Sequence, residues 1–231
     1  MIQNIYSIKK MNHPKKSIKT DIYKTTLDQI IFLYSGYSTE HRANTQPFRL
    51  QNIQNYIDNY QYNPKDLIIR EPLIEHTGSL PIVATTIYPY INNKEVDLGT
   101  SLIMFAIHDI GEIKIGDEIT FTKKEDINEK IEALKLLPEQ FHNIYIDMEE
   151  TKTLTGKFAK SIDKMTPDIV DLITPAEITI KRYQEFMNKK PNEIVPLIKE
   201  HKHPYMIWND FLKNLHLEIL DRLDKKLQPF Y

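Results

Sequence analysis

The sequence contains no cysteine. This absence excludes disulfide bonds, zinc–thiolate sites and thiol nucleophiles, so any metal ion must be held by histidine, aspartate and glutamate. It also agrees with a reducing compartment, and we expect a cytoplasmic protein. No segment approaches about 18 consecutive apolar residues, and the first residues lack the basic start and apolar stretch of a signal peptide. The sequence therefore predicts no membrane span.

Glycine and arginine are scarce, with six and five residues, and neither sign of charge is in excess. Thirty basic against 32 acidic side chains give a net charge of −2, which offers no electrostatic basis for binding a nucleic-acid polymer or an anionic membrane. The chain has no glycine-rich loop before a Lys-Ser/Thr pair and no Gly-x-Ser-x-Gly segment, so neither a Walker loop nor a serine hydrolase is indicated. Hydrophobic residues make up 41% of the 231 residues, which is enough for a sizeable core.

The apolar residues recur at helical spacing, and no alternating run has the length and turn signals of a sheet. Residues 1–20 are predicted as a polar, basic N-terminal arm, followed by a single all-α domain over residues 21–231. Pro81 and Pro89 interrupt one apolar segment, and Pro167 and Pro175 are expected as helix breakers or first-turn residues. The expected helices are residues 49–60, 98–108, 125–137, 139–150, 153–165, 168–187 and 205–227, with an apolar stripe over residues 27–34 that ends near Gly36.

Histidine and acidic residues that could bind a metal ion occur in the middle of the chain. In order they are Glu75-His76, His108-Asp109, Glu112, Asp117 and Asp163. Helix 98–108 is apolar nearly all round and should be central, so His108 and Asp109 at its end need partners. Two imidazoles and two carboxylates suit a divalent ion such as Mn²⁺, Co²⁺, Fe²⁺, Zn²⁺ or Mg²⁺, with coordination positions left for water and a substrate oxygen. Spacing alone leaves open an unrelated helical core with a buried histidine.

Residues 70–80 and 105–121 resemble the HD-domain metal-dependent phosphohydrolases, and most closely their bacterial 5′-deoxynucleotidase branch. The resemblance covers about residues 66–170 and implies an HD-domain helical bundle, here with extra N-terminal and C-terminal helices. The motifs that carry it are Glu75-His76-Thr77, His108-Asp109 with Glu112 and Gly116-Asp117, and Asp163-Lys164.

The resemblance also implies roles for individual residues. The residues expected to ligate one divalent metal ion, whose identity stays open, are His76, His108, Asp109 and Asp163. Asp109 and Glu112 are the expected catalytic residues, with Glu112 orienting or deprotonating the attacking water or protonating the leaving oxygen. Asp117 would contact the sugar of the substrate.

The family's Arg-Trp pair, which lies before the first histidine and contacts phosphate and base, is only partly matched. Arg49-Leu50 is the best counterpart, although it lacks the aromatic residue and lies 27 residues before His76. Arg70 is the alternative, since an arginine fork suits a phosphate. Either arginine would also fit a surface ion pair.

Motifs that are missing separate the chain from other branches of the superfamily. Cyclic-di-GMP phosphodiesterases carry lysine where Glu112 stands, together with a later Gly-Tyr-Pro signature. Guanosine-tetraphosphate hydrolases have Glu-Asp where this chain has Glu112-Ile113. Deoxynucleoside triphosphohydrolases share the metal ligands, so the choice between a monophosphate and a triphosphate substrate stays open.

The expected function is removal of phosphate from (deoxy)nucleoside 5′-monophosphates by a metal-activated water. The alternatives are a deoxynucleoside triphosphate triphosphohydrolase on the same site and a non-catalytic module that senses a nucleotide or a metal. The expected partner is a nucleotide or a similar small phosphoester, without a nucleic-acid polymer or a membrane, and the resemblance allows a homodimer. His201-Lys202-His203 is predicted as a solvated turn rather than a second metal site.

Overall fold

The computed structural model describes residues 22–28, 30–31, 73–115 and 127–231, and these residues form helices and connecting segments without a strand. The all-α fold class is thereby confirmed. Residues 22–28 and 30–31 are helical. The α-helices that follow are α3 (Leu73–Ile87), α4 (Leu98–Ile107), α5 (Glu112–Ile115), α6 (Ile127–Leu136), α7 (His142–Glu150), α8 (Leu154–Ile173), α9 (Ala176–Met187), α10 (Pro191–Lys202) and α11 (Asp210–Leu227). Short 3₁₀ turns are η2 (Tyr88–Tyr90), η3 (Glu139–Phe141), η4 (His203–Tyr205) and η5 (Gln228–Phe230).

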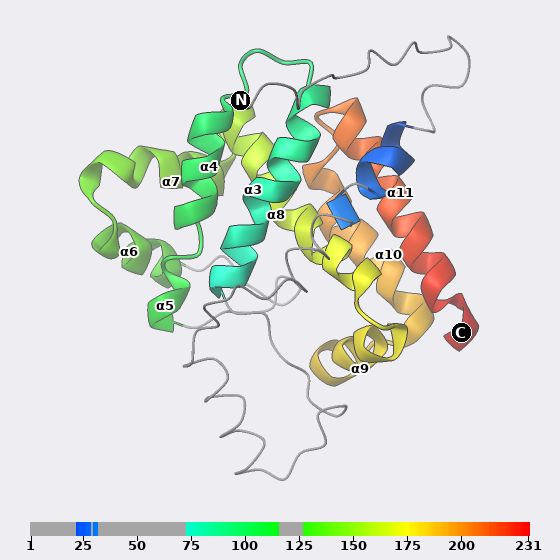
Figure 1. The fold of residues 1–231 in the computed structure, drawn as a ribbon. Helices are drawn as coiled ribbons and strands as arrows, with labels where there is room; N and C mark the ends of the chain where they lie inside the picture. The colour runs from blue at the N-terminus through cyan, green and yellow to red at the C-terminus, as the bar shows by residue number, and fades with distance from the viewer. Residues whose placement is uncertain (1–21, 29, 32–72, 116–126) are drawn as a thin grey trace, which may run out of the picture.

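Helix α8 is the central element of the bundle (Figure 1). It packs against α3, α4, α7, α10 and α11, with α4 and α7 on one side in the view of Figure 1 and α10 and α11 on the other. Its fully buried apolar residues recur at three- and four-residue spacing, which turns one face into the core. They include Phe158, Ile162, Met165 and Ile169.

The start of α8 is fixed against the end of α7. The hydroxyl of Thr153 caps the helix by accepting from the backbone N–H of Gly156, and the Asp147 carboxylate accepts from both the backbone N–H and the hydroxyl of Thr153 at 2.8 and 2.6 Å. A Cβ at Gly156 would lie 2.6 Å from the carbonyl oxygen of Asp147. The close approach of these two helices therefore requires glycine at this position.

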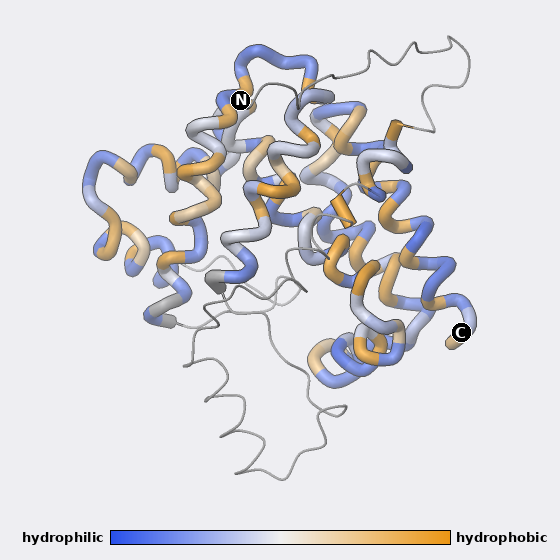
Figure 2. Tube along the Cα trace, in the orientation of Figure 1, coloured by the Kyte–Doolittle hydropathy of each residue, from blue (hydrophilic) through white to orange (hydrophobic). Residues whose placement is uncertain are grey.

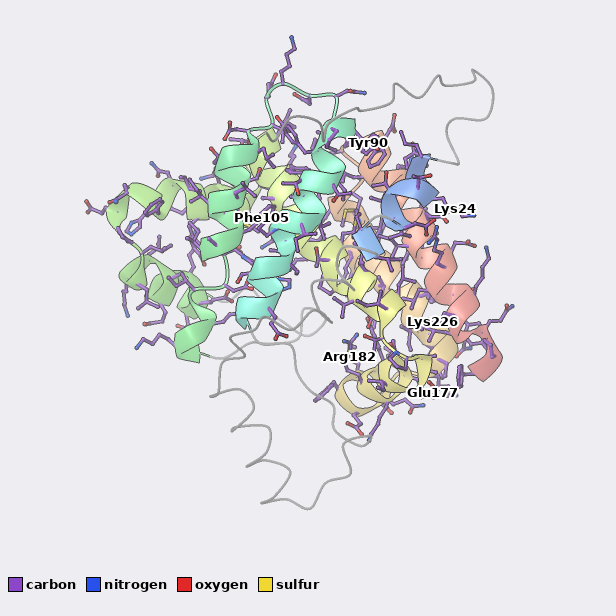
Figure 3. The ribbon with its side chains drawn as sticks, in the orientation of Figure 1. Lys24, Tyr90, Phe105, Glu177, Arg182 and Lys226 are labelled. Atoms are coloured by element: carbon purple, nitrogen blue, oxygen red, sulfur yellow. The ribbon has the colours of Figure 1, made fainter. Side chains whose placement is uncertain are left out.

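The C-terminal end of helix α4 lies in the middle of the molecule. Asp97 caps its N-terminus by accepting from the backbone N–H of Thr100, and the helix ends with His108 as the C-cap. Phe105, labelled in Figure 3, is fully buried in the core shared with α3 and α8. His108 follows this buried turn and is itself buried.

Among the described residues, the buried apolar side chains form three clusters. The largest joins α3, α4, α8 and α11, the second joins α9, α10 and α11, and the third lies between α6, α7 and the end of α4. Figure 2 shows hydrophobic residues recurring along each helix with hydrophilic residues between them. Among the described helices, none combines the length and the hydropathy needed to cross a membrane.

Two prolines that were expected to break helices lie inside them. Pro81 is part of α3, and Pro167 is part of α8, so the predicted boundary between residues 165 and 168 is wrong. Proline lacks the N–H that would bond the carbonyl four residues earlier. The Thr166 hydroxyl supplies a further bond in the same turn by donating to the carbonyl of Ile162 at 2.8 Å. Burial of α8 on several sides offsets the bond that proline removes, and Pro175 does precede the first residue of α9.

Other expected boundaries also shift. Helix α10 was not predicted as a separate element, and it begins with Pro191 in the first helical turn, where a missing N–H costs little. The helix expected from residue 205 begins at Asp210, with Asn209 as its N-cap. Gly36 and the predicted helix 49–60 lie outside the described residues.

The C-terminal end of α7 supports a prediction about stability. Thr151 adopts a left-handed conformation with φ 49°, which is costly for a β-branched residue. Thr151→Gly should therefore raise the free energy of unfolding by about 1 kcal/mol, measured by urea denaturation. Asn188→Gly is the matched control, because Asn188 adopts φ 50° at the end of α9 and asparagine tolerates this region. An equal or larger gain at position 188 would contradict the argument.

Candidate metal centre

Three helices bring two imidazoles and a carboxylate together at the middle of the bundle. His76 comes from the first turn of α3, His108 from the end of α4, and Asp163 from α8. One nitrogen of each histidine and one oxygen of Asp163 all lie within 4.8 Å of one another. These three residues form what we call the candidate metal site.

The distances within the site fit a single bound ion. Oδ1 of Asp163 lies 3.2 Å from Nε2 of His76 and 3.5 Å from Nε2 of His108. Ligand atoms at about 2.1 Å from one ion are separated by about 3.0 Å in octahedral and about 3.4 Å in tetrahedral geometry. The same Asp163 oxygen is therefore placed to share an ion with both histidines.

His108 provides the observation that separates a metal site from an ordinary polar contact. Its Nδ1 lies 3.0 Å from the carbonyl oxygen of Phe105, and because a carbonyl only accepts, Nδ1 carries the hydrogen. Its Nε2 is fully buried and has no hydrogen-bond partner. This nitrogen lies near carboxylate oxygens of Asp109 and Asp163 without a hydrogen bond to either, and a histidine held through its other nitrogen is the usual arrangement of a metal ligand.

Asp109 lies beside this site in the turn that follows α4. Its Oδ2 is 3.0 Å from Nε2 of His108, in an orientation that makes no hydrogen bond, and 3.8 Å from Nε2 of His76. The structure therefore brings Asp109 close to both imidazoles, although it is not part of the three-residue group. Its role as the fourth ligand stays a prediction, as do the ligand roles of the other three residues.

The carboxylates determine the electrostatics of both histidines. Burial lowers the pKa of His76, but the hydrogen bond and charge of Asp163 and the charge of Asp109 outweigh it, so the net shift is upward. Burial also lowers the pKa of His108, but Asp109 and Asp163 outweigh it and raise the pKa to about 10. In the metal-free protein these carboxylates favour a proton on the imidazoles, which a metal ion would displace on binding.

Lys164 contacts the opposite oxygen of Asp163. Its Nζ is 3.2 Å from Oδ2, whereas Oδ1 points to the histidines. Burial raises the pKa of Asp163, but the charge of Lys164 and the two histidines hold it well below its usual range. Burial alone would lower the pKa of Lys164, but the charge of Asp163 outweighs it, so the pKa of Lys164 is raised. The carboxylate is therefore ionised, with one oxygen on the lysine and one available to a metal ion.

Glu112 begins α5 three residues after Asp109. Its backbone N–H donates to the Asp109 carbonyl at 3.0 Å, and its side chain is 8% exposed. The preceding Gly111 lies against α6, where an added Cβ would be 2.5 Å from the carbonyl oxygen of Glu129. A glycine at position 111 thus allows α6 to pack against the turn that carries Asp109 and Glu112.

Three of the predicted site residues lie outside the described residues. They are the expected sugar contact, Asp117, and the two candidate phosphate-binding residues, Arg49 and Arg70. Their predicted roles stay predictions.

A family model of the HD domain matches residues 65–200, which is more than half of the chain and includes all four expected ligands. The chain belongs to the HD-domain family. The match extends about 30 residues beyond the region of resemblance, to include α9 and most of α10. Helix α11 follows the matched region in the sequence and packs against α8.

Comparison with other proteins adds one solved structure. The HD-domain chain is similar to a protein described as a predicted metal-dependent phosphohydrolase from Magnetospirillum magnetotacticum MS-1, with 22% sequence identity and a TM-score of 0.49. The alignment covers 75% of this chain and 94% of the other. No curated protein matches the chain.

A second buried polar cluster, in which Asp168 of α8 contacts Lys202 and His216, was not predicted from the sequence. Lys202 is 3% exposed and pairs with Asp168, so the prediction of a solvated turn over residues 201–203 is wrong. A signal was present in the sequence: Asp168 lies between apolar residues of α8, and His216 lies in the apolar stripe of α11. A buried charge needs a partner, and that requirement could have linked the two segments.

The contrast between two glycines yields a prediction about packing beside Glu112. Gly111→Ala should lower the free energy of unfolding by about 1–3 kcal/mol, because the added methyl group overlaps the backbone of Glu129. Gly78→Ala is the matched control on α3, because residue 78 is exposed and an added Cβ meets no described atom within 4 Å. The control should gain up to about 1 kcal/mol from higher helix propensity. Urea denaturation of both variants measures the difference, and a neutral Gly111→Ala would contradict the packing argument.

Metal addition supplies a second prediction. Mn²⁺ at about 100 times its dissociation constant should raise the free energy of unfolding by about 2.7 kcal/mol, since the ion binds the folded state. His108→Ala should lose most of this shift. His142→Ala should keep it, because His142 contacts the Leu137 carbonyl at 2.9 Å and takes no part in the metal site. An equal shift in all three proteins would contradict the assignment.

Proposed function

We propose that the protein is a metal-dependent phosphohydrolase that removes phosphate from (deoxy)nucleoside 5′-monophosphates. The observation that carries the proposal is the buried Nε2 of His108, which has no hydrogen-bond partner and faces the same Asp163 oxygen as His76. Membership of the HD-domain family supports it. His76, His108 and Asp163 would hold the ion, with Asp109 adjacent to both imidazoles.

A bound divalent ion supplies one kind of chemistry here: it lowers the pKa of a water molecule and polarises a phosphoryl oxygen. The chain's own residues supply the rest. We assign Glu112, the first residue of α5 after the turn that carries Asp109, to take a proton from the attacking water or to give one to the leaving oxygen. The new bond joins the water oxygen to phosphorus, and the bond that breaks joins phosphorus to the ester oxygen, which leaves as an alcohol.

Lys164 contributes positive charge to the same reaction. Its ammonium group lies beside Asp163 and retains 19% exposure of the side chain. A phosphomonoester approaching the site meets the carboxylates of Asp109, Asp163 and Glu112, so a cation near the phosphoryl oxygens lowers the cost of bringing these charges together. We assign Lys164 to attraction of the phosphoryl group.

The nucleotide part of the proposal rests on the motif order. Glu75-His76-Thr77, His108-Asp109 with Glu112, and Asp163-Lys164 follow the pattern of the 5′-deoxynucleotidases. Glutamate at position 112 agrees with that branch and differs from the lysine of the cyclic-di-GMP phosphodiesterases.

Phosphate release separates the catalytic role of Glu112 from metal binding. The metal-stripped protein is refilled with Mn²⁺, Co²⁺ or Mg²⁺ and assayed on nucleoside mono- and triphosphates. We expect orthophosphate from monophosphates, and Glu112→Gln should lower kcat by about 10²- to 10⁴-fold, because the proton transfer is lost. The stabilisation by metal should persist in this variant.

Glu139→Gln is the control, because Glu139 is an exposed residue of η3, between α6 and α7. It should retain full activity. Tripolyphosphate release from triphosphates would replace the monophosphate assignment with a triphosphohydrolase. Metal binding without phosphate release from any substrate would contradict the catalytic proposal and favour a sensing role.

A further inference from the structure

A buried polar network lies one and a half turns beyond Asp163 on α8. Asp168 is fully buried, and its two oxygens contact different helices: Oδ1 accepts from Nζ of Lys202 at 2.5 Å, and Oδ2 lies 3.1 Å from Nε2 of His216. Lys202 ends α10 and His216 lies in the middle of α11. One carboxylate therefore joins three helices, and its charge is offset by the buried lysine.

His216 is connected in turn to His203 in η4. The two Nδ1 atoms are 3.0 Å apart, and the rings are stacked with an interplanar angle of 16°. His216 is fully buried, whereas His203 is partly exposed. We call these two residues the histidine pair.

The contacts define the protonation of the histidine pair. Because a carboxylate accepts, Nε2 of His216 carries a hydrogen, and in the neutral ring its Nδ1 is an acceptor. Nδ1 of His203 must then be the donor across the 3.0 Å contact. The neutral pair shares one hydrogen between its Nδ1 atoms. A first added proton, on Nε2 of His203, leaves this bond in place with one positive charge, whereas a second added proton, on Nδ1 of His216, would place two N–H groups and two positive charges against each other.

The surrounding charges do not compensate a second proton. Asp168 is already paired with Lys202. Asp171, the next acid on α8, is paired with Arg182 of α9 and accepts from the Tyr183 hydroxyl. The other charges that act on His203 are Lys199 of α10 and Lys213 of α11. Burial, then the charge of His216 and then these two lysines lower the pKa of His203.

We propose that the histidine pair is a proton-sensitive contact that holds α11 and η4 against α8, the helix of Asp163. At neutral pH the pair is intact. In acid the partly exposed His203 gains the first added proton and the contact persists; the second added proton puts hydrogens on both Nδ1 atoms, so the Nδ1 contact separates and the attachment of α11 to α8 weakens. His203 and His216 are positioning residues in this scheme, since they act on Asp163 through α8.

Hydrogen exchange of α11 and α10 amides, measured on the metal-free full chain, tests the contact. A histidine whose pKa is lowered by folding stabilises the protein above its unfolded pKa of about 6.5, and this stability is lost as the pH falls below that value. Between about pH 7.5 and about pH 5.5, the protection factors of α11 should fall about tenfold more in the wild type than in His203→Gln, since one pKa unit is a tenfold effect.

His203→Gln keeps a partner for His216 in either state, because an amide can donate or accept. His142→Gln is the matched control, since His142 contacts the Leu137 carbonyl and lies in α7, a helix that does not carry the pair. It should show the wild-type loss. Equal losses in the wild type and His203→Gln, or a loss outside α10 and α11, would overturn the proposal. Titration of His76 and His108 is common to all three proteins and cancels in the comparison.

Mn²⁺ affinity tests whether the contact reaches Asp163, and this step rests on the proposed function. From about pH 7.5 to about pH 5.5 the dissociation constant should rise more in the wild type than in His203→Gln, by at least about twofold. Equal changes would limit the contact to α11 and contradict the coupling to Asp163. Absence of Mn²⁺ binding in every protein would instead contradict the proposed function, while hydrogen exchange would still decide whether the contact exists.

Discussion

Helix α8 buries three carboxylates, and the surrounding helices supply the groups that compensate them. Asp163, Asp168 and Asp171 are each at most 6% exposed, and a buried carboxylate without a partner costs several kcal/mol. The spacing of these acids along α8 distributes their partners over α3, α4, α8, α9, α10 and α11. In chain order the partners are His76, His108, Lys164, Arg182, Tyr183, Lys202 and His216. Most of the helices that pack around α8 therefore also supply partners of its buried carboxylates.

The groups around the three carboxylates differ in how completely they are hydrogen-bonded. Asp168 has a lysine on one oxygen and a histidine on the other, and Asp171 has an arginine and a tyrosine. At Asp163 the histidines are held so that a buried nitrogen of His108 has no hydrogen bond. That difference distinguishes the cluster at Asp163, where we propose that an ion binds, from the pairings of Asp168 and Asp171, which join α8 to α9, α10 and α11. It also explains why a metal ion should stabilise the fold.

Several features could be predicted from the sequence because they depend on local pattern. The apolar run before His108 correctly placed this residue at the end of a helix, although α4 buries only part of its surface and α8 is the central helix. The motif order indicated His76 and Asp163. The helix boundary at Pro167 was predicted incorrectly, because packing around α8 overrides the local cost of proline. The pairing of Asp168 with α10 and α11 depends on contacts between distant segments, which helical periodicity does not encode.

The most direct test of the metal site is a crystal structure of the protein soaked with Mn²⁺, with anomalous scattering recorded at the manganese edge. The account predicts an anomalous peak bonded to Nε2 of His76, Nε2 of His108 and Oδ1 of Asp163, and the same map shows whether Asp109 completes the ligand set. A peak elsewhere on the chain, or a hydrogen-bonded His108 Nε2 with no peak beside it, would contradict the assignment of this cluster as the metal centre.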